Sequence, residues 1–124
     1  MPRLLACLVL ALLAGCAAKQ ARYTGTMTPE GACGTAGRAT LTVRGGHATF
    51  AANDGALLVP GEVAADGTLA GRLELPGVDR KPYPMTLEGK VTEDVATGLY
   101  VTPRCRFSLL LTRTRVGLLG ESEQ

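Results

Sequence analysis

The sequence has only one histidine, no Cys-x-x-Cys motif and no excess of charge, with 13 basic and 11 acidic side chains among 124 residues. Balanced charge excludes the basic surface that nucleic-acid binding requires. One histidine without a paired-cysteine motif argues against a metal centre and a redox dithiol. No apolar run after the first 15 residues is long enough to span a membrane. What remains is one small domain behind an unusual N-terminus.

That N-terminus has the parts of a signal peptide. Arg3 provides a positive start, residues 4–13 are apolar, and Leu13-Ala14-Gly15-Cys16 supplies a small-residue cleavage site. The Leu-Ala-Gly-Cys tetrad resembles the lipobox of bacterial lipoproteins. The resemblance implies cleavage before Cys16, a diacylglycerol on the Cys16 thiol and acylation of the freed amine, with palmitate as a typical chain. The alternative is an ordinary secretory signal in which Cys16 is incidental.

The same resemblance implies a location and a domain plan. Because Ala17, and not aspartate, follows Cys16, the family's sorting rule favours the outer membrane, with the protein anchored by lipid and facing the periplasm. Removing residues 1–15 from 124 leaves 109. We expect a lipidated tether at 16–22, a folded domain at 23–113 and a tail at 114–124 that either docks or is disordered.

The four cysteines then divide by chemistry. Cys7 leaves with the signal peptide and Cys16 carries the lipid, so Cys33 and Cys105 remain as one pair in an exported, oxidising compartment. We therefore predict a structural disulfide between Cys33 and Cys105.

From residue 21 onward the apolar residues alternate with polar ones, which is typical of strands, and no stretch has helical spacing. The alternation predicts an all-β domain, a small antiparallel up-and-down meander of about eight strands that closes into a barrel by pairing the first strand with the last. The alternative is a two-sheet β-sandwich. The expected strands are 21–28, 38–44, 47–52, 56–64, 68–75, 83–91, 95–102 and 104–113.

Two early hairpins have turns that fix their pairing. A two-residue turn at Gly45-Gly46 sets Leu41 opposite Phe50. A three-residue loop at 65–67, with Gly67 left-handed, sets Val63 opposite Leu69, and further along Gly61 opposite Gly71, Val59 opposite Leu73 and Leu57 opposite Leu75. The facing glycines allow the sheet to bend sharply, as a small barrel requires.

Two later hairpins are expected to turn at 92–94, with Asp94 left-handed, and at 102–104. These loops set Leu99 opposite both Leu87 and Phe107, and the resulting alternation points Tyr100 outward.

No pattern points to catalysis. His47 lies at a hairpin tip without a nucleophile patterned near it, and we interpret it as a solvated turn residue. The carboxylates that could serve glycoside chemistry either point outward or lie in loops, so they form no acid/base pair; they are Glu62, Asp66, Glu74 and Asp79. We therefore expect a protein that is not an enzyme and needs no cofactor.

Two binding modes remain. The interior is expected to be a filled core, although its small side chains leave open an apolar pocket for a lipid. On the surface, the proline-rich connection 76–84 carries residue types suited to a protein contact. The candidate contact residues are Arg80, Lys81 and Tyr83 of this connection and the outward-pointing Tyr100, with Leu58, Leu110, Arg104 and Arg106 as possible neighbours.

A lipid-anchored barrel with one disulfide is similar in plan to small inhibitor lipoproteins of the bacterial envelope, including lysozyme inhibitors of the membrane-bound C-type class. That group's Ser-Gly-x-x-Tyr segment has no counterpart here, so no inhibitory residue carries over. The sequence predicts a non-enzymatic envelope lipoprotein whose barrel binds another protein, as an inhibitor or assembly accessory. The alternative is a carrier of lipid or of a small apolar ligand.

Overall fold

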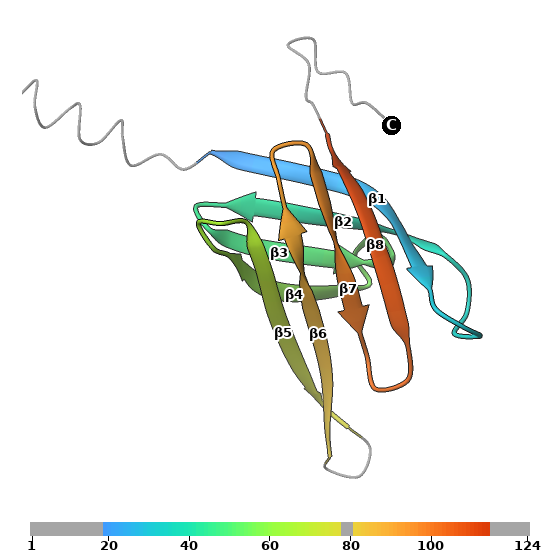
Figure 1. Cartoon of the computed structure of the whole chain (residues 1–124). Coiled ribbons are helices and arrows are strands. Elements are labelled where there is room, and N and C mark those ends of the chain that lie inside the picture. Colours follow the sequence, from blue (N-terminus) through green and yellow to red (C-terminus); the bar gives the residue numbers. More distant parts are fainter. Residues whose placement is uncertain (1–18, 78–80, 115–124) are drawn as a thin grey trace, which may run out of the picture.

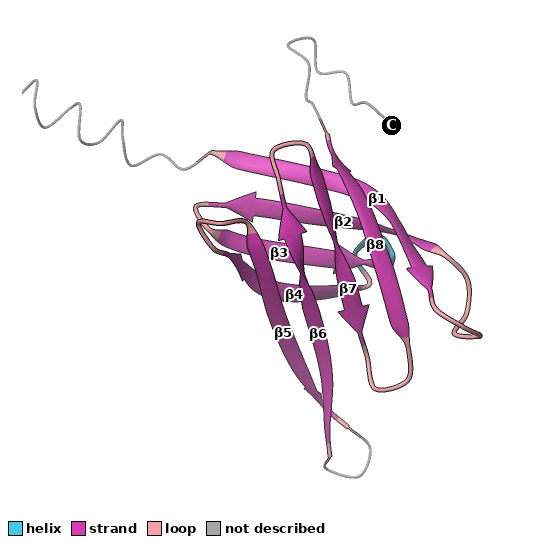
Figure 2. Cartoon of the chain, viewed as in Figure 1, coloured by secondary structure: helices cyan, strands magenta, loops and turns pink. Residues whose placement is uncertain are grey.

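The computed structural model describes residues 19–77 and 81–114, which form eight antiparallel strands in a closed barrel (Figures 1 and 2). Each strand pairs with the next in sequence, and β1 pairs with β8 to close the barrel. The prediction of an up-and-down barrel is confirmed, and the two-sheet sandwich is wrong. The strands are β1 (Gln20–Pro29), β2 (Gly37–Arg44), β3 (His47–Ala52), β4 (Leu57–Val63), β5 (Thr68–Pro76), β6 (Pro82–Val91), β7 (Val95–Val101) and β8 (Arg106–Arg113), with a short 3-10 turn at Asn53–Gly55 between β3 and β4.

The first two hairpins have the predicted pairing near their turns. Leu41 pairs with Phe50 across the Gly45-Gly46 turn, and Val63 pairs with Leu69 across the loop at 65–67. Gly67 has a φ of 91°, which favours glycine because other residues rarely adopt it. The turn chemistry is therefore sufficient to set these two registers.

The β4–β5 pairing stops earlier than predicted. The ladder ends at Gly61 opposite Gly71, so the expected pairs Val59–Leu73 and Leu57–Leu75 do not form. Pro60 explains the end of the ladder, because proline has no N–H to donate at the next hydrogen-bonding position. From this point β4 and β5 separate (Figure 1).

Strand β7 is shifted by one residue from its predicted register. Leu87 pairs with Tyr100 and not with Leu99, and Tyr100 in turn pairs with Phe107. Both flanking turns are one residue shorter than expected, and Asp94 does not have a positive φ. Tyr100 therefore faces the interior, which corrects the prediction that it points outward.

The turns themselves show the physical reason for the shift. Thr92 Oγ1 accepts a hydrogen bond from the Val95 N–H at 3.2 Å, and Thr102 Oγ1 accepts one from the Cys105 N–H at 3.0 Å. Each threonine thus bridges a tight turn with two residues inside it. The turn before β7 and the turn after it are each one residue shorter than predicted. The first difference reverses which side chains of β7 point inward, and the second restores the predicted inward set in β8. The side chains of β6 and β8 therefore point as predicted.

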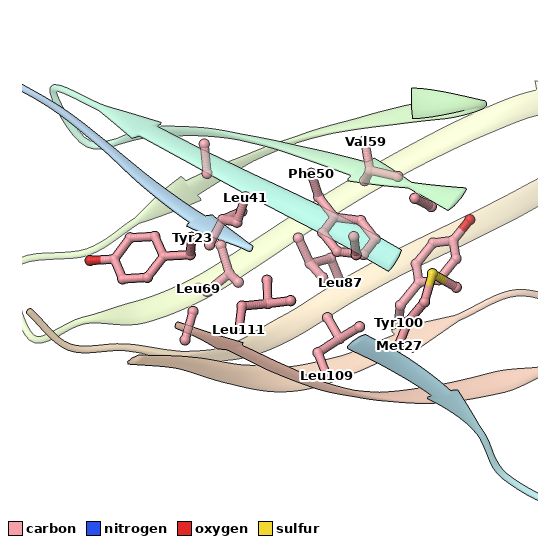
Figure 3. Close-up of a cluster of buried hydrophobic side chains, with 14 of the residues drawn as sticks. Tyr23, Met27, Leu41, Phe50, Val59, Leu69, Leu87, Tyr100, Leu109 and Leu111 are labelled. Carbon is pink, nitrogen blue, oxygen red and sulfur yellow. The ribbon is translucent and has the colours of Figure 1, made fainter. Parts of the chain in front are cut away.

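The barrel interior is filled by large apolar side chains (Figure 3). Tyr100 contacts Phe50 and Phe107 with ring centroids 5.2 Å and 5.8 Å away, a range in which aromatic pairs attract. No charged side chain of the described residues is buried. The largest side chains with almost no exposure are Phe50, Met27, Leu41, Met85, Leu87, Leu111 and Val59.

The two ends of the barrel differ. At the near end, where β1 begins, neighbouring strands stay joined beyond their ladders by backbone hydrogen bonds from Val63 N–H to Gly46, Val91 N–H to Gly67, Arg113 N–H to Asp94 and Thr114 N–H to Arg22, all of 2.7–2.8 Å. At the far end the β5–β6 hairpin extends past its neighbours, since β6 pairs with β7 only as far as Thr86 (Figure 1). The far end is therefore the more open of the two.

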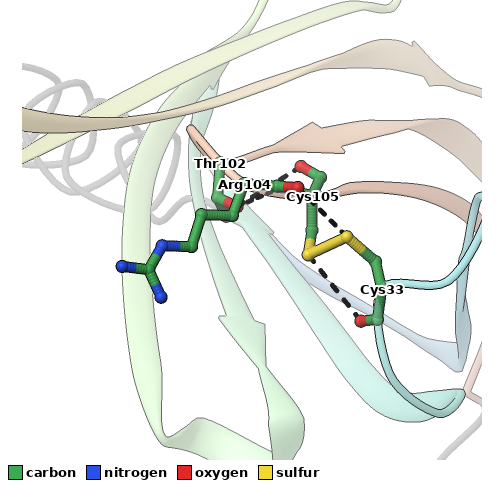
Figure 4. Close-up of a disulfide and its surroundings, with 4 residues drawn as sticks. All are labelled: Cys33, Thr102, Arg104 and Cys105. Atoms are coloured by element: carbon green, nitrogen blue, oxygen red, sulfur yellow. Dashed lines mark hydrogen bonds between the residues drawn. A yellow bond between two sulfur atoms is a disulfide. The ribbon is translucent and has the colours of Figure 1, made fainter.

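The predicted disulfide joins Cys33, in the β1–β2 connection, to Cys105, just before β8, with Cα atoms 5.6 Å apart (Figure 4). It lies at the far end beside the β1–β8 seam, where the Glu30 N–H also donates to the Arg106 carbonyl at 2.9 Å. Among the described residues, no helix is long and apolar enough to cross a membrane.

Candidate partner-binding site

A groove opens at the far end between the tip of the β5–β6 hairpin and the turn that joins β7 to β8. Its volume is about 500 Å³. The hairpin tip is held by a hydrogen bond from the Gly77 N–H to the Lys81 carbonyl at 2.9 Å. We call this feature the far-end groove; its lining residues are Leu75, Pro76, Gly77, Lys81, Pro82, Tyr83, Pro103 and Arg104.

The apolar floor of the groove follows from strand alternation. Leu75 pairs with Tyr83 across the hairpin, and both side chains are on the face that, nearer the middle of the barrel, carries Met85 and Leu87 into the core. Because the hairpin extends past β4 and β7, this face is left partly uncovered, and Leu75 is 38 % exposed. The groove is thus a continuation of the core-facing surface beyond the closed barrel.

The described residues that line the groove carry charge of one sign. Lys81 and Arg104 are its charged lining residues, and no carboxylate of the described residues lines it. The two ion pairs within the described ranges lie elsewhere and are solvent-exposed, Arg72 with Glu74 at 3.5 Å and Arg106 with Glu30 at 3.9 Å. An apolar floor between two cations suits a segment that combines apolar and acidic groups.

The structure brings together only some of the predicted contact residues. Lys81 and Tyr83 both line the far-end groove, whereas Arg80 lies outside the described residues, as does Cys16. Tyr100 is 4 % exposed, so it cannot offer the surface that was expected of it. Burial raises the pKa of the Tyr100 hydroxyl, and the nearby Tyr83 raises it further. Tyr100 is therefore part of the core and not of the groove lining.

The other expected surface residues do not form one patch. Leu58 and Leu110 are 55 % and 60 % exposed, but they belong to β4 and β8, which the strand order places on opposite sides of the barrel. Arg104 was expected as a possible neighbour of Lys81 and Tyr83 and does line the groove with them, whereas sequence reasoning missed Leu75. Leu75 and Arg104 join the groove through the length of the hairpin and the tight turn at 102–105, neither of which a pattern of alternation reveals.

The residues considered for catalysis do not gather into one site, and Asp79 lies outside the described residues. His47 pairs with Glu62 across β3 and β4, at the near end. The Thr68 backbone N–H donates to Asp66 at 2.9 Å and lowers the pKa of that carboxyl, as expected for an aspartate that closes a turn. No group of three or more potential metal ligands occurs in residues 19–77 and 81–114.

Comparison with known protein families, with characterised proteins and with solved structures finds no match to this chain. The far-end groove is therefore interpreted from its own chemistry.

Proposed function

We propose that the protein is a non-enzymatic envelope lipoprotein whose barrel binds another envelope protein through the far-end groove. The observation that carries the proposal is the groove itself, an uncovered continuation of the core face with Lys81 and Arg104 beside it. Apolar surface left open on a small barrel and edged by charge is typical of a contact between proteins.

The filled interior favours this proposal over a lipid carrier. Phe50, Leu41 and Leu87 are essentially inaccessible to solvent, and they fill the space in which a carrier would hold its ligand (Figure 3). The groove, by comparison, is open to solvent, and an open apolar surface suits a flat or extended protein partner.

The lipobox suggests how the groove would be presented. Cys16 precedes the first residue of β1 by four positions, a distance of at most about 14 Å when extended. A lipid on Cys16 would keep the near end close to the bilayer. The groove would then lie at the opposite end, about 25 Å away for strands of this length, and face partner proteins in the periplasm.

Site-specific photocrosslinking in intact host cells tests the partner. A photoreactive residue at Pro103, which lines the groove, should give a discrete protein adduct, whereas the same residue at the exposed Leu110 should not. Reversing both groove charges, Lys81→Glu with Arg104→Glu, should reduce the adduct at Pro103. Equal labelling at Pro103 and Leu110, or no adduct at either, would overturn the proposal.

Fractionation tests the anchor. Wild-type protein should be recovered with the outer membrane and should incorporate labelled palmitate. Cys16→Ser should lose the label and leave the membrane fraction. Recovery of wild-type protein without palmitate in the soluble fraction would contradict the proposed lipid anchor. The proposed binding at the groove would still be decided by the crosslinking experiment.

A further inference from the structure

The seam between β4 and β5 is open over half its length. The two strands pair at only three positions, from Val63 opposite Leu69 to Gly61 opposite Gly71. Yet β4 starts at Leu57 and β5 continues to Pro76. Below Gly61, each of the two strands therefore presents one edge without a strand beside it (Figure 1).

The pairing pattern shows which backbone groups face this open seam. A hydrogen bond from Ala64 N–H to the Thr68 carbonyl makes 64 and 68 a hydrogen-bonded pair, so the even-numbered residues of β4 and β5 direct their N–H and C=O groups toward each other. The bond from Gly77 N–H to Lys81 independently assigns the odd-numbered residues of β5 to β6. Beyond Gly61, Pro60 would lie opposite Arg72 but has no N–H. The next hydrogen-bonding pair in which both residues have an N–H would therefore be Leu58 and Glu74.

Leu58 and Glu74 thus mark the middle of the open seam. The β4–β5 ladder ends before it reaches either residue, so it does not pair their seam-facing N–H and C=O groups. Apolar side chains are also uncovered here, since Leu58 is 55 % exposed on the outer face of β4 and Leu75, next to Glu74 on the core-facing side of β5, is 38 % exposed. Free backbone groups and exposed apolar side chains at one place are the two features that strand addition uses.

The opposite edge of the hairpin lacks donors. Even-numbered residues of β6 face β7, and beyond Thr86 these are Pro84 and Pro82, which have no N–H. On β5, Glu74 keeps its N–H. A strand that approaches the hairpin tip can therefore exchange hydrogen bonds in both directions at β5 and not at β6.

We infer that the protein partner inserts an extended segment that adds as a strand to the open edge of β5, centred on Glu74. This inference rests on the proposed function and names its mode of recognition. The residue opposite Glu74 exchanges both backbone hydrogen bonds and points outward, while its two neighbours point inward beside Leu73 and Leu75 and must be apolar. Because Leu75 also lines the far-end groove, Lys81 lies near one end of the segment and selects an acidic residue there.

A synthetic strand tests this inference without knowledge of the partner. The probe is the peptide acetyl-Glu-Thr-Val-Thr-Val-Thr-amide, added to the full-length, isotope-labelled protein in detergent micelles; in an antiparallel pair with its second threonine opposite Glu74, its N-terminal glutamate lies opposite Gly77, the residue that is hydrogen-bonded to Lys81. At saturating peptide, exchange of the Glu74 amide hydrogen should slow at least tenfold. Unchanged exchange at Glu74 would overturn the inference.

Matched N-methylated peptides identify the edge that pairs. When valine side chains point inward, the threonine amides face β5, so methylating the threonine amides should weaken binding at least tenfold and methylating the valine amides should have little effect. Equal binding of the two methylated peptides would contradict strand addition. This comparison does not depend on any protein variant.

Two variants separate the inference from the proposed function. Glu74→Pro removes the seam-facing N–H, which β6 does not use, and should lose the peptide, whereas Glu74→Ala removes only the side chain and should retain it. Amide spectra check that both variants are folded. If Glu74→Pro keeps the crosslinked adduct at Pro103, strand addition is wrong and the groove contact stands. If the protein with the photoreactive residue at Pro103 and Glu74 unchanged gives no adduct, the proposed function fails, and the peptide experiment alone decides the inference.

Discussion

Removal of the disulfide is the perturbation whose magnitude follows most directly from the structure. Cys33 and Cys105 are 72 positions apart, so their bond closes most of the folded domain into one loop. In the chain-entropy description, a loop of this length lowers the entropy of the unfolded state enough to stabilise the fold by about 4 kcal/mol. Replacing both residues, Cys33→Ser with Cys105→Ser, should remove that contribution.

The fold should nevertheless persist. The seam that the disulfide supports is also held by the β1–β8 ladder from Tyr23 opposite Arg113 to Pro29 opposite Phe107. We therefore expect an unchanged far-ultraviolet dichroism spectrum and a midpoint of thermal unfolding lower by about 15–30 °C, at about 4–8 °C per kcal/mol for a domain of this size.

Urea denaturation of the oxidised wild type, the reduced wild type and the double serine variant measures the effect. The last two should agree with each other and should both be less stable than the first. A loss below about 1 kcal/mol would refute the loop-entropy reasoning. A double variant without β-sheet dichroism would show instead that the ladder cannot close unless the disulfide is present.

Three further perturbations probe the core and its tyrosines. Phe50→Ala should lower the free energy of unfolding by about 3–5 kcal/mol in urea, because Phe50 has no exposed surface. Tyr23→Phe should cost about 1 kcal/mol in the same assay, because the Tyr23 hydroxyl donates to the Thr92 carbonyl at 2.7 Å. Burial raises the pKa of Tyr100, so its contribution is fully present below the ordinary tyrosine pKa near 10 and is lost as pH rises through the higher folded value. Tyr100→Phe should therefore shrink the loss of stability between about pH 9 and about pH 11, as followed by urea denaturation at each pH.

Much of the fold was predictable because turns and alternation agree. Every predicted strand boundary lies within two residues of the structure. The register failed in β7, where alternation allowed two solutions. One turns Leu99 and Val101 inward, and the other, which the structure has, turns Ala96, Gly98 and Tyr100 inward and buries Ala96 and Tyr100. The prediction chose the register that turns the aliphatic side chains inward. In the structure, the Tyr100 ring packs against two aromatic rings in the interior. In each flanking turn, a threonine hydroxyl accepts a hydrogen bond across the turn.

The candidate site was predictable only in part. Lys81 and Tyr83 were identified because proline-stiffened connections present side chains for contact. Arg104, which was expected only as a possible neighbour, lies in the groove because the turn after β7 is tight, and Leu75, which was not expected, lies there because the hairpin extends past its neighbours. These features depend on where ladders end, which is a property of several strands together and not of one stretch of sequence.

The prolines of the domain explain where the ladders end and what the open edges can bind. Pro60, Pro76, Pro82 and Pro84 all occupy even-numbered positions, which the hydrogen-bond pattern directs toward the open sides of β4, β5 and β6. Each proline therefore removes a donor that would invite unspecific pairing with another sheet. Glu74 lies within this series and keeps its N–H. Because prolines remove the donors near Glu74, an added strand can exchange backbone hydrogen bonds in both directions at this edge in only one register. The same prolines that limit unspecific pairing with other sheets would therefore make strand addition at Glu74 selective.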